Sequence, residues 1–299
     1  MNTLMGNQFT FELPGRSNQS LVYWRRGKSG DRPLLLLHGL GDCAAVWAGV
    51  ATELTNSSDD SGYDIVVPDL PGHGDSSKGD RPYSTEAIIQ DLEALLDHLG
   101  WSSAVIVGHS WTGKVVARWM QQSPQRFDRA VIIDPFFISK MPDWLRLSFP
   151  VLYRVLPFLK LSGPFVDRAA AETCARGLKQ YRGWNPWQAA AFAANIEQKS
   201  DGTWGSKLDL LARDRVFEDV LCVAGFTQPV STPTLLLLPD RGLNQFEWQT
   251  QDFHRFCAAL TVQSLPGNHW PFLSHPIEVA QALQHWLGLP MQNPENAEQ

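Results

Sequence analysis

The chain has 299 residues, of which 43% are hydrophobic and 19% are charged, a composition typical of a globular protein with a sizeable core. Its formal net charge of −6 and the lack of a polybasic stretch argue against binding to nucleic acid or to an anionic membrane surface. The amino-terminal residues are polar and no apolar run is long enough for a bilayer, so we expect a cytoplasmic protein without a signal peptide or membrane span. The four cysteines are far apart and include no C-x-x-C pair, which argues against a zinc site or a disulfide framework.

Short β-type runs alternate with helix-type segments through the first 135 residues. The clearest strand is Pro33–His38, a continuous apolar run followed by glycine, as expected for a buried parallel strand. Ser84 is placed to cap the helix that follows it. In chain order, the sequence predicts strands at Phe9–Leu13, Leu21–Arg25 and Pro33–His38, a helix at Ala44–Leu54, a strand at Asp64–Pro68, a helix at Ser84–Leu99, a strand at Ala104–Val107, a helix at Trp111–Gln121 and a strand at Ala130–Ile133.

The alternation then stops and later resumes. From residue 136 to about 227 no strand is predicted, and Asn185-Pro186 is typical of a helix start. The remaining predictions are strands at Leu235–Leu238 and Thr261–Leu265, with helices at Gln245–Leu260 and Pro276–Leu287. We therefore expect an α/β fold, with a mostly parallel sheet covered by helices on both faces. Residues 1–135 and 228–290 would form the core domain, 136–227 a helical cap, and 291–299 a disordered tail.

The motif most informative about chemistry is GHSWTG at 108–113, between a predicted strand and a predicted helix. A serine at such a junction sits on a sharp turn with its Oγ exposed, which makes Ser110 a candidate nucleophile. The helix start beside it offers backbone N–H groups to a developing negative charge. The same stretch, read through Lys114, also matches the G-x-x-x-x-G-K phosphate-binding pattern. That match is incomplete, because Val115 stands where the pattern needs Ser or Thr for magnesium.

Two further motifs follow predicted strands. His38-Gly39-Leu40-Gly41 is a glycine-rich turn that can aim a backbone N–H at an oxyanion, and we assign the two donors to the amides of Leu40 and Trp111. The alternative is a plain glycine turn. His269 lies in a loop after the last predicted strand, at the sheet edge where α/β active sites collect. It is the candidate general base. The motif DLPGHGDS at 69–76 is, taken alone, a polar turn.

The order HGLG, DLPGHGDS, GHSWTG and a late His-Trp-Pro-Phe closely resembles the α/β-hydrolase superfamily. The resemblance spans roughly Leu21–Leu287 and puts residues 136–227 in the position of the family's variable cap. It implies that Ser110 attacks a carbonyl carbon, that His269 takes its proton and later activates water, and that no cofactor is needed. Thr112 stands where the family's elbow usually has glycine, which we interpret as tolerable variation.

The carboxylate of the triad is the open question. The family commonly places it in the loop after the strand predicted at Leu235–Leu238, but Gly242 occupies that position here. Asp240 lies two residues earlier. Some members take the acid from the end of the preceding core strand, which here is Asp134. We favour Asp134 and keep Asp240 as the alternative. The third possibility is that no functional acid exists and Asp134 only caps the start of the insertion.

A serine at position 110 argues against dehalogenase and epoxide hydrolase chemistry, which use a carboxylate nucleophile in this fold. The leading interpretation is a cofactor-free and metal-free serine hydrolase, a carboxylesterase or thioesterase-like enzyme that cleaves a small apolar ester through an acyl-enzyme. Alternatives are a C–C bond hydrolase, a haloperoxidase-like enzyme, or a non-catalytic ligand-binding protein. Aromatic residues of the predicted cap either line an apolar pocket or pack the cap onto the core: Trp144, Phe149, Tyr153, Phe158, Phe165, Trp184, Trp187 and Phe192.

Overall fold

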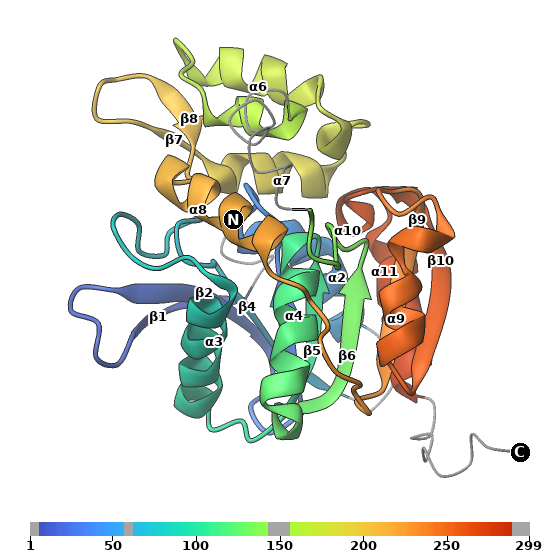
Figure 1. Ribbon diagram of the computed structural model, residues 1–299. Coiled ribbons are helices and arrows are strands. Elements are labelled where there is room, and N and C mark those ends of the chain that lie inside the picture. The colour runs from blue at the N-terminus through green and yellow to red at the C-terminus, as the bar shows by residue number, and fades with distance from the viewer. Residues whose placement is uncertain (1–5, 57–61, 143–155, 289–299) are drawn as a thin grey trace, which may run out of the picture.

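The computed structural model describes residues 6–56, 62–142 and 156–288. An eight-stranded sheet runs through them in the order β1-β2-β4-β3-β5-β6-β9-β10, and helices cover both faces (Figure 1). The first two strands form an antiparallel pair that joins β4 in antiparallel fashion, and all other neighbours are parallel. The strands are β1 (Asn7–Glu12), β2 (Ser20–Gly27), β3 (Arg32–Leu37), β4 (Tyr63–Pro68), β5 (Ala104–His109), β6 (Phe127–Ile133), β9 (Thr234–Arg241) and β10 (Leu260–Asn268).

The apolar runs predicted as central strands supply both halves of the core. In β3, Leu35 and Leu37 point into one apolar cluster while Leu34 and Leu36 point into the other, because side chains alternate along a strand. Each of these leucines is fully buried, which stabilises the fold by about 1.5–3 kcal/mol per side chain. Helices α3 (Thr85–Leu99) and α4 (Trp111–Gln122) cover the first cluster, and α2 (Ala48–Asn56) and α11 (Pro276–Gly288) cover the second. The fold class expected from the sequence is confirmed.

Most predicted elements form, with two differences in the helices. Ser84 caps α3 as predicted, its side chain accepting from the backbone N–H of Ala87. The helix predicted at Ala44–Leu54 begins as a 3₁₀ turn, η1 (Ala44–Trp47), before α2. The helix predicted at Gln245–Leu260 is much shorter: it consists of η6 (Glu247–Gln249) and α9 (Gln251–Phe256). It stops because Cys257 becomes extended and pairs with Val230, which turns the chain into β10.

The segment between β6 and β9 lies over one end of the sheet (Figure 1). Its described part contains η4 (Pro157–Ser162), α6 (Arg168–Arg176), η5 (Lys179–Tyr181), α7 (Pro186–Asn195) and α8 (Leu210–Cys222). The start at Asn185-Pro186 is confirmed, since Asn185 caps α7. The prediction of no strand in this segment is wrong, because β7 (Ile196–Gln198) and β8 (Trp204–Ser206) form a short hairpin. The predicted tail at 291–299 lies outside the described residues. Among the residues that are described, no helix is both long enough and apolar enough to span a bilayer.

Lys114 ties this segment to the helix that follows Ser110. Its side chain is fully buried, and its Nζ donates to the carbonyl oxygens of Ser139 (3.3 Å), Val220 and Val223 (2.8 Å). Val220 lies in the last turn of α8 and Val223 follows that helix, so the lysine satisfies carbonyls that the helix end leaves without partners. Burial lowers the pKa of Lys114 to about 7. The lysine of the incomplete phosphate-loop match is thus a structural anchor between two elements.

Candidate active site

Ser110 occupies a sharp turn between β5 and α4. Its backbone has φ 58° and ψ −121°, a conformation that non-glycine residues adopt at a cost of about 1–3 kcal/mol. The turn is crowded: a Cβ added at Gly108 would lie 2.7 Å from the carbonyl oxygen of Thr112. The Thr112 hydroxyl accepts a hydrogen bond from the His109 N–H at 2.8 Å, so this departure from the usual elbow adds a bond to the turn. Ser110 therefore lies at the turn between a strand and a helix, where the sequence predicts it.

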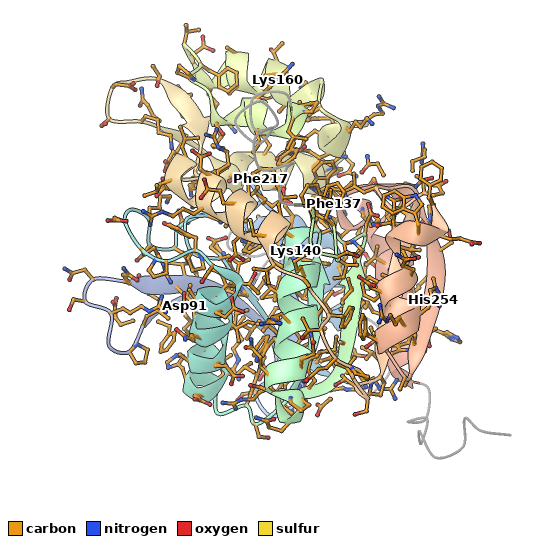
Figure 2. The ribbon with its side chains drawn as sticks, in the orientation of Figure 1. Asp91, Phe137, Lys140, Lys160, Phe217 and His254 are labelled. Carbon is orange, nitrogen blue, oxygen red and sulfur yellow. The ribbon has the colours of Figure 1, made fainter. Side chains whose placement is uncertain are left out.

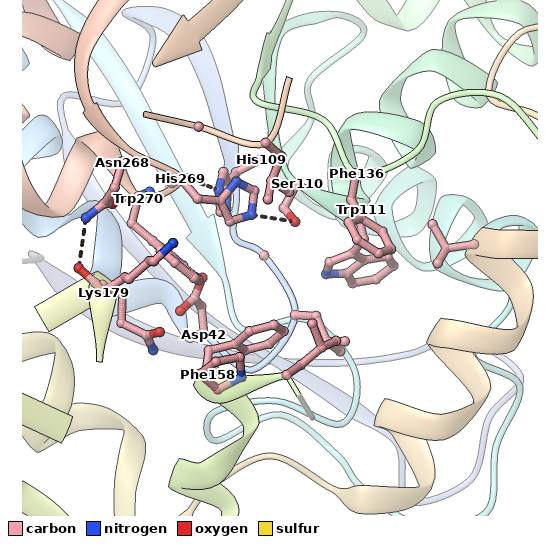
Figure 3. Close-up of a pocket in the computed structure, with 18 of the residues that line it drawn as sticks. Asp42, His109, Ser110, Trp111, Phe136, Phe158, Lys179, Asn268, His269 and Trp270 are labelled. Atoms are coloured by element: carbon pink, nitrogen blue, oxygen red, sulfur yellow. Dashed lines mark hydrogen bonds between the residues drawn. The ribbon is translucent and has the colours of Figure 1, made fainter. Parts of the chain in front are cut away.

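His269 follows β10 and reaches back to the serine. Its Nε2 lies 3.0 Å from the Oγ of Ser110 (Figure 3). His109 contacts the segment that carries His269, because its Nε2 donates to the backbone carbonyl of His269 at 2.7 Å. Burial lowers the pKa of His109 well below its usual range, which keeps this ring neutral. The sequence carries no signal for this contact, since it joins residues 160 positions apart.

Asp134 completes the array from the end of β6. Its Oδ2 lies 2.6 Å from the Nδ1 of His269. The loop after β9 also donates to this carboxylate, through the backbone N–H of Leu243 (2.8 Å) and through both the backbone N–H (3.2 Å) and the side-chain amide (2.8 Å) of Asn244. Burial acts to raise the pKa of Asp134, but the hydrogen bonds and charge of His269 and the donors of the loop prevail, and the pKa is lowered. The site therefore favours the ionised acid.

The structure does not bring Asp240 to His269. Asp240 is exposed, and its Oδ1 accepts from the backbone N–H of Gly267 at 2.8 Å, near the end of β10 that leads to the histidine. Gly242 faces the carboxylate that does contact His269: a Cβ added there would lie 2.5 Å from the Oδ2 of Asp134. The glycine at the usual acid position therefore leaves room for a carboxylate that arrives from another strand.

The two predicted oxyanion donors belong to segments that follow neighbouring strands of the sheet, β3 and β5. Leu40 is in the turn after β3, and Trp111 is the first residue of α4. Both residues line the cavity that contains Ser110. Among the residues described here, neither backbone N–H donates to a protein acceptor. The start of α4 adds its partial positive charge at the same place, and the two amides are thus available to an anionic oxygen.

The cavity above the serine has a volume of about 220 Å³ and two chemically different ends. Figure 3 shows Asp42, Lys179 and Asn268 on one side of Ser110 and His269, and Phe136 and Trp111 on the other. The apolar end carries one polar atom without a partner in the described chain, the Nε1 of Trp111. The apolar side chains of the wall are those of Leu40, Phe136, Leu156, Pro157, Phe158, Val216, Phe217, Val220 and Leu243.

The aromatic residues singled out from the sequence mostly pack rather than line this cavity. Of those that the structure describes, only Phe158 lines it. Phe165, Trp184 and Phe192 belong to a separate apolar cluster in the segment between β6 and β9, and Trp187 packs against the core. Trp144, Phe149 and Tyr153 lie outside the described residues. The packing alternative thus holds for four of the five, and the aliphatic wall comes from α8, which the sequence did not single out.

No metal site is evident in the parts of the chain that the structure describes. No group of three or more histidine, cysteine, aspartate or glutamate side chains there is arranged to hold an ion. The four cysteines are free thiols. What the site offers is an acid, a base, a hydroxyl and two backbone donors, which is the set of groups that nucleophilic acyl transfer uses.

Comparisons with known proteins agree with the fold. The family model described as alpha/beta hydrolase fold matches residues 32–158. An uncharacterized protein of Mycobacterium tuberculosis (strain ATCC 25618 / H37Rv) is 32% identical over 151 residues, which are 47% of this chain and 43% of that protein, so the match spans less than half of the relative's length. An sn-1-specific diacylglycerol lipase of Danio rerio is 23% identical over 87% of this chain and 80% of the lipase. The crystal structure of E-2-(acetamidomethylene)succinate hydrolase has a TM-score of 0.78 at 17% identity, over 95% of this chain and 99% of that one.

Proposed function

We propose that this chain, which has the α/β-hydrolase fold and matches that family's model over residues 32–158, is a cofactor-free serine hydrolase that cleaves small esters or thioesters with an apolar acyl group. The observation that carries the proposal is the continuous hydrogen-bonded array of Asp134, His269 and Ser110 at the wall of a cavity. The lipase among its relatives supports hydrolase activity. The proposal goes further than these relatives in naming the residues and the type of bond.

The distances suit a double-displacement reaction. Ser110 Oγ attacks the carbonyl carbon while His269 Nε2, 3.0 Å away, takes its proton. Asp134 accepts from the Nδ1–H of His269, which fixes the tautomer and stabilises the imidazolium that forms. The amides of Leu40 and Trp111 bind the oxyanion, and losing one such donor typically costs about 10²–10³ in rate. The alcohol or thiol leaves with the proton from His269, and a water activated by the same ring then hydrolyses the acyl-serine.

The apolar end of the cavity suits the acyl group. Its wall includes Phe136 and three side chains of α8, those of Val216, Phe217 (labelled in Figure 2) and Val220, whereas Phe158 lies on the side of Asp42 and Trp270. We propose that residues 136–227 act as a cap that closes this end and shields the acyl chain from water. Burial of each methylene contributes about 0.8 kcal/mol, so a longer acyl chain gains affinity until the cavity is full.

Two rival functions lose their support. Epoxide hydrolase chemistry in this fold needs a carboxylate nucleophile, whereas position 110 is serine. A non-catalytic ligand-binding protein was suggested by the glycine at the usual acid position, but Asp134 contacts His269 from another strand. A C–C bond hydrolase or haloperoxidase-like enzyme would use the same serine and histidine, so substrates must separate these from an esterase.

The experiment has two parts. A fluorophosphonate probe should label the wild-type chain at Ser110, as located by peptide mass spectrometry, and should not label Ser110→Ala. Hydrolysis of p-nitrophenyl esters from acetate to decanoate should then rise with chain length and fall when the chain exceeds the cavity. No labelling and no ester hydrolysis by a folded wild-type protein would overturn the proposal. Equal rates across the series would overturn the apolar acyl site alone.

A further inference from the structure

An apolar acyl group accounts for only one end of the cavity. The other end carries Asp42, Lys179 and Asn268, which Figure 3 shows on the opposite side of Ser110 from Phe136. Asn268 is already engaged there, since its side-chain amide donates to the carbonyl oxygen of Lys179 at 2.8 Å. Lys179 is exposed to solvent. Two buried polar residues also line the cavity: Asp42, and Gln180, which follows Lys179 in η5.

Gln180 presents a buried acceptor without a protein partner. The residue is only 3% exposed and lines the cavity. Its Oε1 has no hydrogen-bond partner in the described part of the chain. Buried polar atoms in native proteins nearly always have one. Because Gln180 also lines the cavity, a donor group on a bound ligand would supply the partner that this oxygen lacks.

Asp42 presents the complementary group. It is 2% exposed and lines the same cavity, and its Oδ2 accepts from the Nε1 of Trp270 at 3.1 Å. Burial raises the pKa of Asp42 to about 8, against the weaker lowering effect of its Trp270 and Gly39 donors. At neutral pH this carboxyl is therefore protonated and carries an O–H donor in addition to its acceptor oxygens.

We propose that Asp42 and Gln180 form a polar subsite that binds a hydroxyl group on the alcohol half of the ester, an assignment that rests on the proposed function. A hydroxyl both donates and accepts, so it can donate to Gln180 Oε1 and accept from the carboxyl of Asp42. A neutral group suits the site better than an anion, because an acid already lies there and the nearest lysine is exposed. The substrate is thereby an amphiphilic ester, with an apolar acyl chain and a hydroxylated alcohol.

The test compares two butyrate esters of the same size, 2-hydroxyethyl butyrate and propyl butyrate, which differ by a hydroxyl in place of a methyl. The wild-type kcat/KM should favour the hydroxylated ester by about tenfold or more, since a site built to bind a hydroxyl discriminates strongly against its absence. Gln180→Met, which keeps the size and removes the acceptor, should abolish this preference by lowering kcat/KM for the hydroxylated ester much more than for propyl butyrate. Gln251→Met, at an exposed position of α9, is the control and should keep the preference.

A second pair of variants addresses the acid. Asp42→Asn retains a donor and an acceptor and should keep most of the preference, whereas Asp42→Leu should lose it. Equal wild-type rates on the two esters, or an undiminished preference in Gln180→Met, would overturn the subsite.

Ligand binding to Ser110→Ala, measured by calorimetry, separates this outcome from failure of the proposed function. If that variant binds the hydroxylated ester more tightly while the wild type hydrolyses neither ester, the hydrolase proposal fails and the subsite stands. If the wild type hydrolyses both esters equally and Ser110→Ala binds them equally, the subsite fails and the hydrolase proposal stands.

Discussion

Asp134 is held by more than the histidine that it orients. Three N–H groups of Leu243 and Asn244 point at its carboxylate from the loop after β9, and its own backbone has φ 42°, in the left-handed region. A non-glycine residue there is strained, so the surrounding bonds must hold it in place. The carboxylate is thus fixed from three sides: β6 carries it, the loop after β9 cradles it and His269 receives it.

The first prediction concerns the identity of the acid. Asp134→Asn should lower kcat for p-nitrophenyl butyrate by about 10⁴, because an amide in place of the carboxylate stabilises the wrong tautomer of His269. Asp240→Asn is the matched control and should keep near wild-type turnover, since the partners of the Asp240 carboxylate within the described residues are Gly267 of β10 and the adjacent Arg241. Loss of activity in the Asp240 variant with retention in the Asp134 variant would reverse the assignment.

A second prediction tests the room that Gly242 provides. Gly242→Ala should lower kcat by about 10²-fold, because its Cβ would displace the carboxylate from His269 and a misplacement of about 1 Å can cost that much. Steady-state kinetics should be paired with thermal unfolding, which should change little. Gly288→Ala, where a Cβ meets nothing within 4 Å, is the control. Full activity in Gly242→Ala would mean that the acid tolerates movement.

At the scale of whole elements, hydrogen bonds join α4, which follows Ser110, to α8, which lines the cavity. The start of α4 carries the turn with Ser110, and α8 supplies the aliphatic wall of the cavity. Lys114, one turn into α4, binds the carbonyl oxygens at the end of α8. Asp219 of α8 also accepts from Thr85 at the start of α3, through both backbone and hydroxyl. Ser110 and the cavity-lining side chains of α8 are therefore positioned by one connected set of helices.

The third prediction follows from this anchor. Lys114→Met should lower the free energy of unfolding by on the order of 3 kcal/mol, because it leaves three buried carbonyls without a donor. Urea unfolding followed by circular dichroism measures the change. Arg118→Met on the same helix removes a partly exposed ion pair with Glu86 and should cost less than about 1 kcal/mol. Similar losses in the two variants would show that Lys114 is no anchor.

At the scale of the molecule, the sequence predicted the sheet better than the site's supporting contacts. Continuous apolar runs such as Leu34–Leu37 indicate strands that are buried on both faces, because such strands lack the alternation of polar and apolar residues seen in half-exposed strands. The positions of Ser110 and His269 follow from turns at strand ends, and Asp134 was preferred only through the family pattern. Neither the burial of Asp42, which depends on Trp270 from 228 positions away, nor that of Lys114 could be inferred, because both depend on tertiary contacts.

A fourth prediction concerns stability across pH. Burial raises the pKa of Asp42 from its ordinary value of 3.8 to about 8 in the fold. Between these values the folded chain holds a proton that the unfolded chain has released. Stability therefore falls as pH rises through this window, by at most about 1.4 kcal/mol per pH unit. Asp42→Asn removes this effect, so its unfolding free energy relative to wild type should improve steadily as the pH rises from about 4 to 8.

The measurement is the difference between the two proteins in urea unfolding at several pH values. The wild-type curve alone is less informative, because Lys114 has the opposite effect on stability above pH 7. Its pKa is lowered to about 7 in the fold, so above that pH the folded chain has lost a proton that the unfolded chain still binds. Lys114 therefore makes the stability rise with pH. The difference cancels this contribution. A pH-independent difference would mean that Asp42 is ionised in the fold.

The exclusion between Gly242 and Asp134 also constrains how such a chain can have changed during evolution. A side chain at 242 and the carboxylate of Asp134 compete for one volume, since the added Cβ would lie 2.5 Å from Oδ2. A lineage moving its acid from one strand to the other therefore cannot hold a working copy at both places and discard one later. It must make both replacements together or pass through an ancestor with an impaired triad, which would tend to keep lineages with the two arrangements apart.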